Sequence, residues 1–202
     1  MPPKGERRKQ QIINTAKEMF IDKGFQSTHI GQVCEKLNIA RGTVYQYFSN
    51  KKEILYAILE SVTEKIEDVL YQDDLMDFLS TNPETRSVIK FVSDRISACI
   101  SILIDEPIVI KLIFKDIVGI DAEVVERVNT SIMQIRKRIS EEIEEYKRRG
   151  IFKGALDSDI TSSMLIGGIM MLIYEYDKRN MDVLDRAVVE SITNNYLNGV
   201  LK

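Results

Sequence analysis

Residues 30–48 read IGQVCEKLNIARGTVYQYF, and the spacing of their apolar side chains predicts two short helices joined by a tight turn. Val33 and Val44 fall on the faces that would meet where the helices cross, and Cys34 supplies a small side chain at the crossing. Asn38 lies between the helices and tolerates the left-handed backbone angles that such a turn needs. The stretch therefore predicts a helix-turn-helix.

The outward face of the second short helix carries polar groups, which is the feature that suggests a binding role. Arg41, Thr43, Gln46 and Tyr47 can all form hydrogen bonds with phosphates or base edges. Through residue 53 the chain has ten Lys and Arg against five Asp and Glu, whereas the remainder has 18 against 26. This local basic excess indicates a polyanionic partner for the N-terminal part alone.

Helical periodicity extends over the rest of the chain, so the fold class expected is all-α, with about nine helices. Ser27 or Thr28 is expected to cap the helix that begins near residue 30, and the Asn50–Glu53 capping box opens a long helix. Asn82 is expected to cap a later helix that has Pro83 at its first position. The expected helices are 6–23, 30–37, 41–48, 50–70, 82–103, 108–118, 121–149, 157–178 and 182–201.

Composition places the chain among globular proteins, with 44% hydrophobic and 29% charged residues. The longest apolar run, residues 164–174, is shorter than the roughly 18 residues that span a bilayer. The first residues are charged and lack the apolar stretch of a secretory signal, so a cytoplasmic location is expected. Cys34 and Cys99 lie far apart in the sequence and are expected to be single reduced thiols.

The N-terminal quarter resembles the signature of the tetracycline-repressor (TetR) family of transcriptional regulators. The resemblance covers residues 11–55, and its most specific part is the Gly42-Thr43-Val44-Tyr45-Gln46-Tyr47-Phe48 core followed by Lys51. It implies a DNA-binding domain over residues 1–53 and a ligand-binding and dimerisation domain over 54–202. It further implies a homodimer, in which two recognition helices enter successive major grooves of palindromic double-stranded operator DNA about 34–36 Å apart.

The resemblance also implies which side chains meet DNA. Gly42 would let the backbone approach closely, and Lys51 would add its charge to the exposed N–H groups at the start of a helix. Asn38 replaces the usual turn glycine, Ala40 replaces a common serine, and His29 stands where threonine is frequent, so either Thr28 or His29 would meet a phosphate. Tyr45 is expected either to pack or to contact DNA. The expected DNA-binding residues are Thr28, His29, Arg41, Gly42, Thr43, Tyr45, Gln46, Tyr47 and Lys51.

Residues 164–174 are apolar around nearly the whole circumference of the expected helix, so that helix must be covered on more than one side. Paired glycines in its middle cost about 1 kcal/mol each relative to alanine, a cost typical of close backbone approach. The approaching helix belongs either to a second copy, as the family implies, or to the same chain. The expected dimer interface comprises Met164, Gly167, Gly168, Met171, Leu184, Val188 and Ile192.

An effector pocket is expected among the C-terminal helices. Binding of the effector would release the protein from operator DNA, as in a repressor. The abundance of Ile and Met suggests a small, largely apolar effector, with Arg95 or Arg136 available to an acidic head group. The expected lining residues are Phe91, Arg95, Cys99, Leu103, Phe114, Met133, Arg136, Met170 and Tyr174.

Other classes of function fit the sequence less well. No cofactor or metal site is expected, because His29 is the single histidine and the cysteines are not clustered. An enzyme is not expected either, since no nucleophile elbow or phosphate-binding glycine loop is found. The alternative is a helical protein–protein adaptor without DNA-binding activity, which would leave the run from Gly42 to Lys51 without a role.

Overall fold

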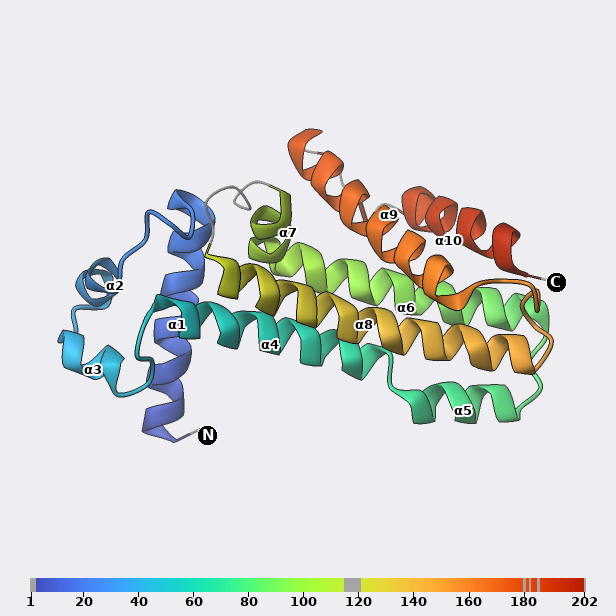
Figure 1. Cartoon of the computed structure of the whole chain (residues 1–202), viewed down its shortest axis with the longest axis horizontal. Helices are drawn as coiled ribbons and strands as arrows, with labels where there is room; N and C mark the ends of the chain where they lie inside the picture. Colours follow the sequence, from blue (N-terminus) through green and yellow to red (C-terminus); the bar gives the residue numbers. More distant parts are fainter. Residues whose placement is uncertain (1–2, 115–120, 180, 182, 185, 202) are drawn as a thin grey trace. The chain divides into compact units, whose positions relative to one another are not determined.

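The structure is a computed structural model that describes residues 3–114, 121–179, 181, 183–184 and 186–201 (Figure 1). The described residues form ten helices. The one β-bridge among them is isolated and joins Phe152 to Leu201. The all-α class predicted from the sequence is therefore confirmed. The helices are α1 (Lys4–Lys23), α2 (Ile30–Leu37), α3 (Arg41–Tyr45), α4 (Lys51–Val69), α5 (Gln72–Ser80), α6 (Thr85–Asp105), α7 (Pro107–Phe114), α8 (Ala122–Arg148), α9 (Ser158–Arg179) and α10 (Arg186–Val200).

Several boundaries differ from the expected ones. Helix α5 was not expected, and α3 ends at Tyr45 rather than at residue 48. Helix α6 begins at Thr85 because Asn82 adopts a left-handed φ of 49°, so the expected cap at Asn82 is wrong. The carbonyl of Glu84 accepts the first N–H groups of α6 instead. The end of the helix expected over residues 108–118 lies partly outside the described residues.

The chain divides into two compact units, which we describe separately. Unit 1 comprises Met1–Val62 and Glu106–Asn129, and unit 2 comprises Thr63–Asp105 and Thr130–Lys202. Helices α4 and α8 contribute residues to both units. In the described part of the chain, no helix is long and apolar enough to cross a bilayer.

Unit 1 is built around the apolar stripe of α1. Ile12, Ala16, Met19 and Phe20 recur at helical spacing and are buried, and the ring of Phe25 packs edge-on against Phe20 at 5.1 Å. Helix α7 is joined to α1 by an ion pair of 2.9 Å between Lys17 and Glu106 and by Lys111, whose ammonium donates to the carbonyl of Ile21. These contacts place α7 against α1, which also packs against α2.

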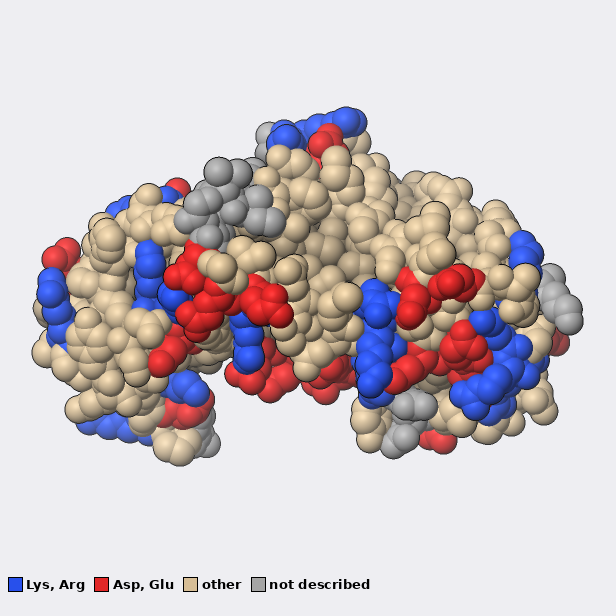
Figure 2. Space-filling model, viewed as in Figure 1, with Lys and Arg blue, Asp and Glu red and all other residues tan. Residues whose placement is uncertain are grey.

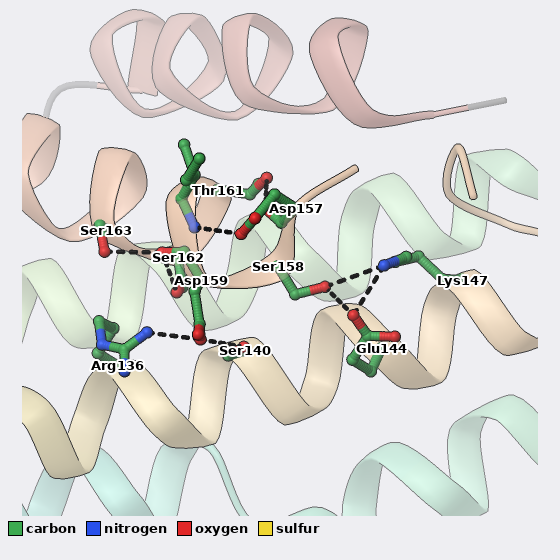
Figure 3. Close-up of polar contacts among 11 residues, drawn as sticks. Arg136, Ser140, Glu144, Lys147, Asp157, Ser158, Asp159, Thr161, Ser162 and Ser163 are labelled. Atoms are coloured by element: carbon green, nitrogen blue, oxygen red, sulfur yellow. Dashed lines mark hydrogen bonds and ion pairs between the residues drawn. The ribbon is translucent and has the colours of Figure 1, made fainter. Parts of the chain in front are cut away.

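Unit 2 contains a polar connection between α8 and the start of α9 (Figure 3). Asp157 caps α9, since its Oδ1 accepts the N–H of Ile160 at 2.9 Å. The Ser158 hydroxyl donates to Glu144 of α8, and the Lys147 ammonium donates to the same carboxylate at 2.7 Å. One turn of α9 is thereby fixed to α8 by charge-assisted hydrogen bonds.

Both cysteines are free thiols, as the sequence predicts. Cys34 is buried, and Cys99 is half-buried. Burial raises the pKa of the Cys99 thiol to about 12, so this thiol stays protonated at neutral pH.

Candidate nucleic-acid interface and effector site

The turn between α2 and α3 has the geometry that its sequence predicts. Asn38 adopts the left-handed conformation, with φ 49° and ψ 52°. Its N–H donates to the carbonyl of Glu35 at 3.1 Å, and the N–H of Ile39 donates to that of Cys34 at 3.0 Å. The last carbonyls of α2 are thus satisfied while the chain reverses, and α3 begins two residues later at Arg41.

Helix α3 has a buried side and an exposed side. Val44 is fully buried, and Phe48, just beyond the helix, is also buried. On the other side Arg41, Gly42 and Gln46 are exposed, and Tyr45 is 53% exposed. The exposed fraction of Tyr45 shows that its ring is not a core residue of the described chain. Thr43 and Tyr47 are half-buried.

A shallow depression collects residues from α2, α3 and the start of α4. The expected DNA-binding residues His29, Arg41, Tyr45 and Lys51 line it. The other expected DNA-binding residues do not line this depression. Two of them, Gly42 and Gln46, are nevertheless exposed, and each follows a lining residue in the sequence. No neighbouring atom lies within 4 Å of the position that a β-carbon of Gly42 would occupy.

The structure distinguishes the two alternatives at residues 28 and 29. The Thr28 side chain is buried at 1% exposure, and its hydroxyl donates to the carbonyls of Gly24 at 2.9 Å and Met19 at 3.2 Å. His29 is exposed and is the N-terminal cap of α2, a position expected for Ser27 or Thr28. The His29 N–H donates to Oε1 of Gln32 at 3.0 Å. Of the two side chains, that of His29 is therefore the exposed one.

The side chain of Lys51 binds the turn between α1 and α2, whereas a contact with DNA is expected for it from the sequence. Its ammonium donates three hydrogen bonds, to the carbonyls of Phe25, Gln26 and Thr28 at 2.8, 2.9 and 3.1 Å. It also lies 4.6 Å from the centre of the Phe25 ring. Partial burial lowers the pKa of Lys51. Because an ammonium has three donors, all of them are occupied by the α1–α2 turn.

The N-terminus of α4 is nevertheless well formed. The Asn50 side chain accepts the N–H groups of Lys52 and Glu53 at 2.9 and 3.2 Å, which confirms Asn50 as the cap. Glu53 reaches back to the N–H of Ser49 at 2.7 Å. The backbone of Lys51 therefore starts a capped helix whose N-terminus favours an anion.

Lys52, the next residue, joins α4 to the start of α8 within unit 1. Its ammonium lies 2.8 Å from Asp121 and 2.7 Å from Glu123. Hydrogen bonds to these two carboxylates raise the pKa of Lys52, and the same contacts lower the pKa values of Asp121 and Glu123. Lys52 is thus a connecting residue, which sequence reasoning did not identify because its partners lie some 70 residues away.

The residues expected to line an effector pocket do not all come together. Arg95 and Cys99 line a cavity within unit 2, together with Glu142, Tyr146 and Tyr196. Phe91 lies next to this group, since the Arg95 guanidinium is 4.9 Å from its ring. Phe91, Leu103, Met133, Arg136, Met170 and Tyr174 do not line the cavity, and Phe114 belongs to unit 1.

Arg136 is engaged elsewhere. Its Nη1 donates to Oδ1 of Asp159 at 2.5 Å, and the same oxygen accepts the Ser140 hydroxyl at 2.9 Å (Figure 3). These contacts lower the pKa of Asp159 and keep it charged. The Arg136 charge is therefore compensated by the first turn of α9, which is a different role from receiving an acidic head group.

The residues expected at a dimer interface lie on exposed or half-exposed parts of unit 2. Met164 is 72% exposed, Met171, Gly167 and Gly168 are also exposed, and a β-carbon at either glycine would meet no atom within 4 Å. An open groove runs between α9 and α10. Its lining includes Met164, Gly168, Leu172, Ala187, Val188 and Ile192. In Figure 2 the surface over these two helices carries few charged side chains on the face shown.

Comparison with known proteins agrees with the geometry of α1–α4. Residues 12–58 match the family model of bacterial regulatory proteins, tetR family. The chain is 36% identical over 62 residues to the HTH-type transcriptional regulator HbdR of Aromatoleum sp. (strain CIB) and, over the same length, to SrpR of Pseudomonas putida. Each alignment covers 31% of this chain, and the chain spans only 27% and 29% of those relatives' lengths.

The fold of the whole chain is also similar to solved structures. Fatty acid degradation regulator FadR from Bacillus halodurans superposes with a TM-score of 0.75 at 18% identity, covering 95% of each chain. FadR from Bacillus subtilis, solved in complex with stearoyl-CoA, gives 0.76 at 20% identity, covering 94% of this chain and 98% of the other. Residues 12–58 thus match the tetR family of bacterial regulatory proteins, and the fold of the whole chain is similar to that of these solved structures.

Proposed function

We propose that the protein is a transcriptional regulator that binds palindromic operator DNA as a homodimer and is released by a small, largely apolar effector. The observation that carries the proposal is the exposed polar side of α3, where Arg41, Tyr45 and Gln46 stand free on a helix whose opposite side is buried. A short helix held in this way can enter a major groove and present its outer side chains to base edges.

In the proposed complex the side chains of α3 divide into two groups. Arg41, Gln46 and Tyr45 read bases or the adjoining backbone, with Gly42 allowing a close approach. Thr43, Tyr47 and His29 hold phosphates, and the capped N-terminus of α4 adds its N–H groups. The Lys51 ammonium does not contact DNA in this proposal, because its three donors are occupied by carbonyls of the α1–α2 turn. Its contribution is to hold that turn in place.

Dimerisation in the proposal uses α9 and α10. The exposed Met164 and Met171, the bare Gly167 and Gly168, and the apolar groove between the helices supply a surface that a second copy can bury. Leu184, Val188 and Ile192 belong to the same proposed interface. Two-fold symmetry then presents two copies of α3 to successive turns of DNA, about 34–36 Å apart.

The effector in the proposal binds unit 2 and shifts the population of dimers towards one whose recognition helices no longer match the grooves. The cavity that contains Arg95 and Cys99 is the proposed site. Similarity to a regulator solved with stearoyl-CoA supports a site for an apolar ligand in this fold. We further propose that the protein is a repressor, that it works in the cytoplasm and that it catalyses no reaction. In this proposal residues 1–53 bind DNA, and residues 54–202 bind the effector and the second copy.

Selection of random duplexes by the purified protein tests this function. The expected product is an inverted repeat whose half-sites are about one helical turn apart, bound with an affinity that falls steeply as salt is added. Tyr47→Ala combined with Arg41→Ala should abolish the selection, whereas Lys90→Ala, which removes an exposed cation of α6 paired with Asp94, should not. Recovery of no sequence above background at low salt would remove the proposal.

The exposed apolar side of α9 also favours a second candidate, an adaptor that binds another protein through this surface. The two candidates differ in the random-duplex selection, since an adaptor enriches no sequence. They differ as well in solution, because a regulator buries this surface in its own homodimer.

A further inference from the structure

The cavity in unit 2 combines apolar walls with a small group of buried polar side chains. It is about 70 Å³ in volume, roughly half of the 150 Å³ that accommodates benzene in an engineered apolar cavity. Val92, Ile96, Ile139 and Ile169 form part of its walls, and Arg95 and Glu142 are its charged members. The volume suits a head group and a few carbons, so a longer ligand must displace wall side chains.

Arg95 has hydrogen-bond donors that no described residue accepts. The residue is 9% exposed, and its Nε and Nη2 are buried without a hydrogen-bond partner in the described part of the chain. A guanidinium has five donors, and leaving them unpaired in a buried site is costly. The cavity therefore presents donors that require an acceptor.

The charge of Arg95, by contrast, is already compensated. Oε2 of Glu142 lies 3.3 Å from Nη2 of Arg95, and both side chains are largely buried. Burial raises the pKa of Glu142, and the Arg95 charge opposes this shift. A ligand carboxylate would place two anions beside one guanidinium, and a ligand ammonium would face that guanidinium directly. Either charge would lose its hydration without gaining a free counter-ion.

We propose that this cavity binds the head group of an uncharged, apolar ligand that carries a carbonyl, such as a primary amide or an ester. The carbonyl accepts from Nε and Nη2 of Arg95, an amide N–H donates to Glu142, and the tail lies along the isoleucine walls. This inference rests on the proposed function for the existence of an effector site. It departs from the acidic head group expected from the sequence, because Arg95 pairs with Glu142 and Arg136 with Asp159.

Calorimetric titration of the full chain with matched ligands tests the chemistry. The probes are the straight-chain amides from butanamide to octanamide, the carboxylates of the same lengths, and the corresponding amines. The best amide should bind at least about tenfold more tightly than its carboxylate or amine, since only the amide avoids an uncompensated buried charge. Equal or tighter binding of a carboxylate overturns the proposal, and so does the absence of amide binding at every length.

A charge change at Glu142 sharpens the test. Glu142→Gln leaves Arg95 uncompensated, so the preference should reverse towards the carboxylate, whereas Glu141→Gln should change nothing. Glu141 is the matched control, because it is an exposed neighbour that pairs only with Lys137 and Arg138 among the described contacts. An unchanged preference in folded Glu142→Gln overturns the proposal.

If Glu142→Gln does not fold, a double variant replaces it. Arg95→Met with Glu142→Met removes both charges together and keeps the volume, so it should fold and should lose amide binding by about tenfold or more. Retained amide binding in this variant overturns the proposal. All titrations are made without DNA, so their failure is distinguishable from a failure of operator binding, which the random-duplex selection measures.

Discussion

Helices α3 and α9 both expose one side to solvent, and the two exposed sides differ in chemistry. On α3 the exposed side chains are those of Arg41, Tyr45 and Gln46, which keep favourable hydration while they are unbound. On α9 they include Met164 and Met171, whose removal from water is favourable. An exposed polar side is suited to a partner that comes and goes, whereas an exposed apolar side is suited to a permanent one.

The largest effect is expected where the apolar side of α9 is made polar. Met164→Glu should convert the proposed dimer to a monomer, because the proposed interface on α9 and α10 could not accept two unpaired carboxylates across its axis. Loss of the second half-site contact should then weaken operator binding by about 100-fold or more, equal to about 3 kcal/mol. Sedimentation velocity and operator titration measure the two changes.

Met133→Glu is the control for this substitution. Met133 is an exposed methionine of α8 and is not among the residues of the α9–α10 groove, so the same change there should leave the mass unchanged. If the Met164→Glu protein still sediments as a dimer, the dimer interface does not lie on α9.

A smaller effect is expected from the polar side of α3. Gln46→Ala should weaken operator binding by about 1–3 kcal/mol and relax the preference at one base pair of each half-site, because an amide reads base edges directly. Titration against operators that differ at single positions measures both effects. A uniform loss across all operators would show that Gln46 contacts only the backbone.

Lys51 sharpens the comparison further, since its side chain is polar yet committed to its own fold. Lys51→Met leaves three carbonyls without their donor, so the free energy of unfolding should fall by about 2 kcal/mol. The salt dependence of operator binding should keep its slope, because no phosphate contact by the ammonium is lost. If instead the slope of log affinity against log salt concentration became shallower by about one, the wild-type ammonium would have to contact a phosphate in the complex.

The smallest effect is expected at the polar contact between α8 and α9. Arg136 and Ser140 lower the pKa of Asp159, so the folded state favours the charged carboxylate. The contact therefore stabilises the fold at pH values above the ordinary carboxyl pKa of 3.8, and this contribution is lost as the pH falls through the lower folded value. Asp159→Asn should reduce the melting temperature slightly at pH 7, and the difference from wild type should vanish in acid.

The helix-turn-helix could be predicted from the sequence because its determinants are local. The left-handed turn at Asn38, the inward Val44 and the Asn50 cap each depend on residues a few positions away. Helix α5 was missed, because it is short and its buried positions are few, with Leu75 and Leu79 as its buried hydrophobic residues among those described.

The roles of the charged residues could not be predicted in the same way. Arg95 and Arg136 look alike in the sequence, which leaves either of them available to an acidic head group. Their environments differ because Arg136 meets the first turn of α9 and Arg95 meets Glu142 inside a cavity. For Lys51 the sequence likewise predicts a DNA contact, because the three carbonyls that bind its ammonium belong to a turn 23 or more residues earlier. Such pairings follow from the tertiary fold.

The two adjacent lysines at the start of α4 have a mechanical consequence for unit 1. Lys51 ties the first turn of α4 to the α1–α2 turn, and Lys52 ties it to Asp121 and Glu123 at the start of α8. Within unit 1, side-chain contacts of two consecutive residues therefore link the start of α8, through the first turn of α4, to the segment leading into α2.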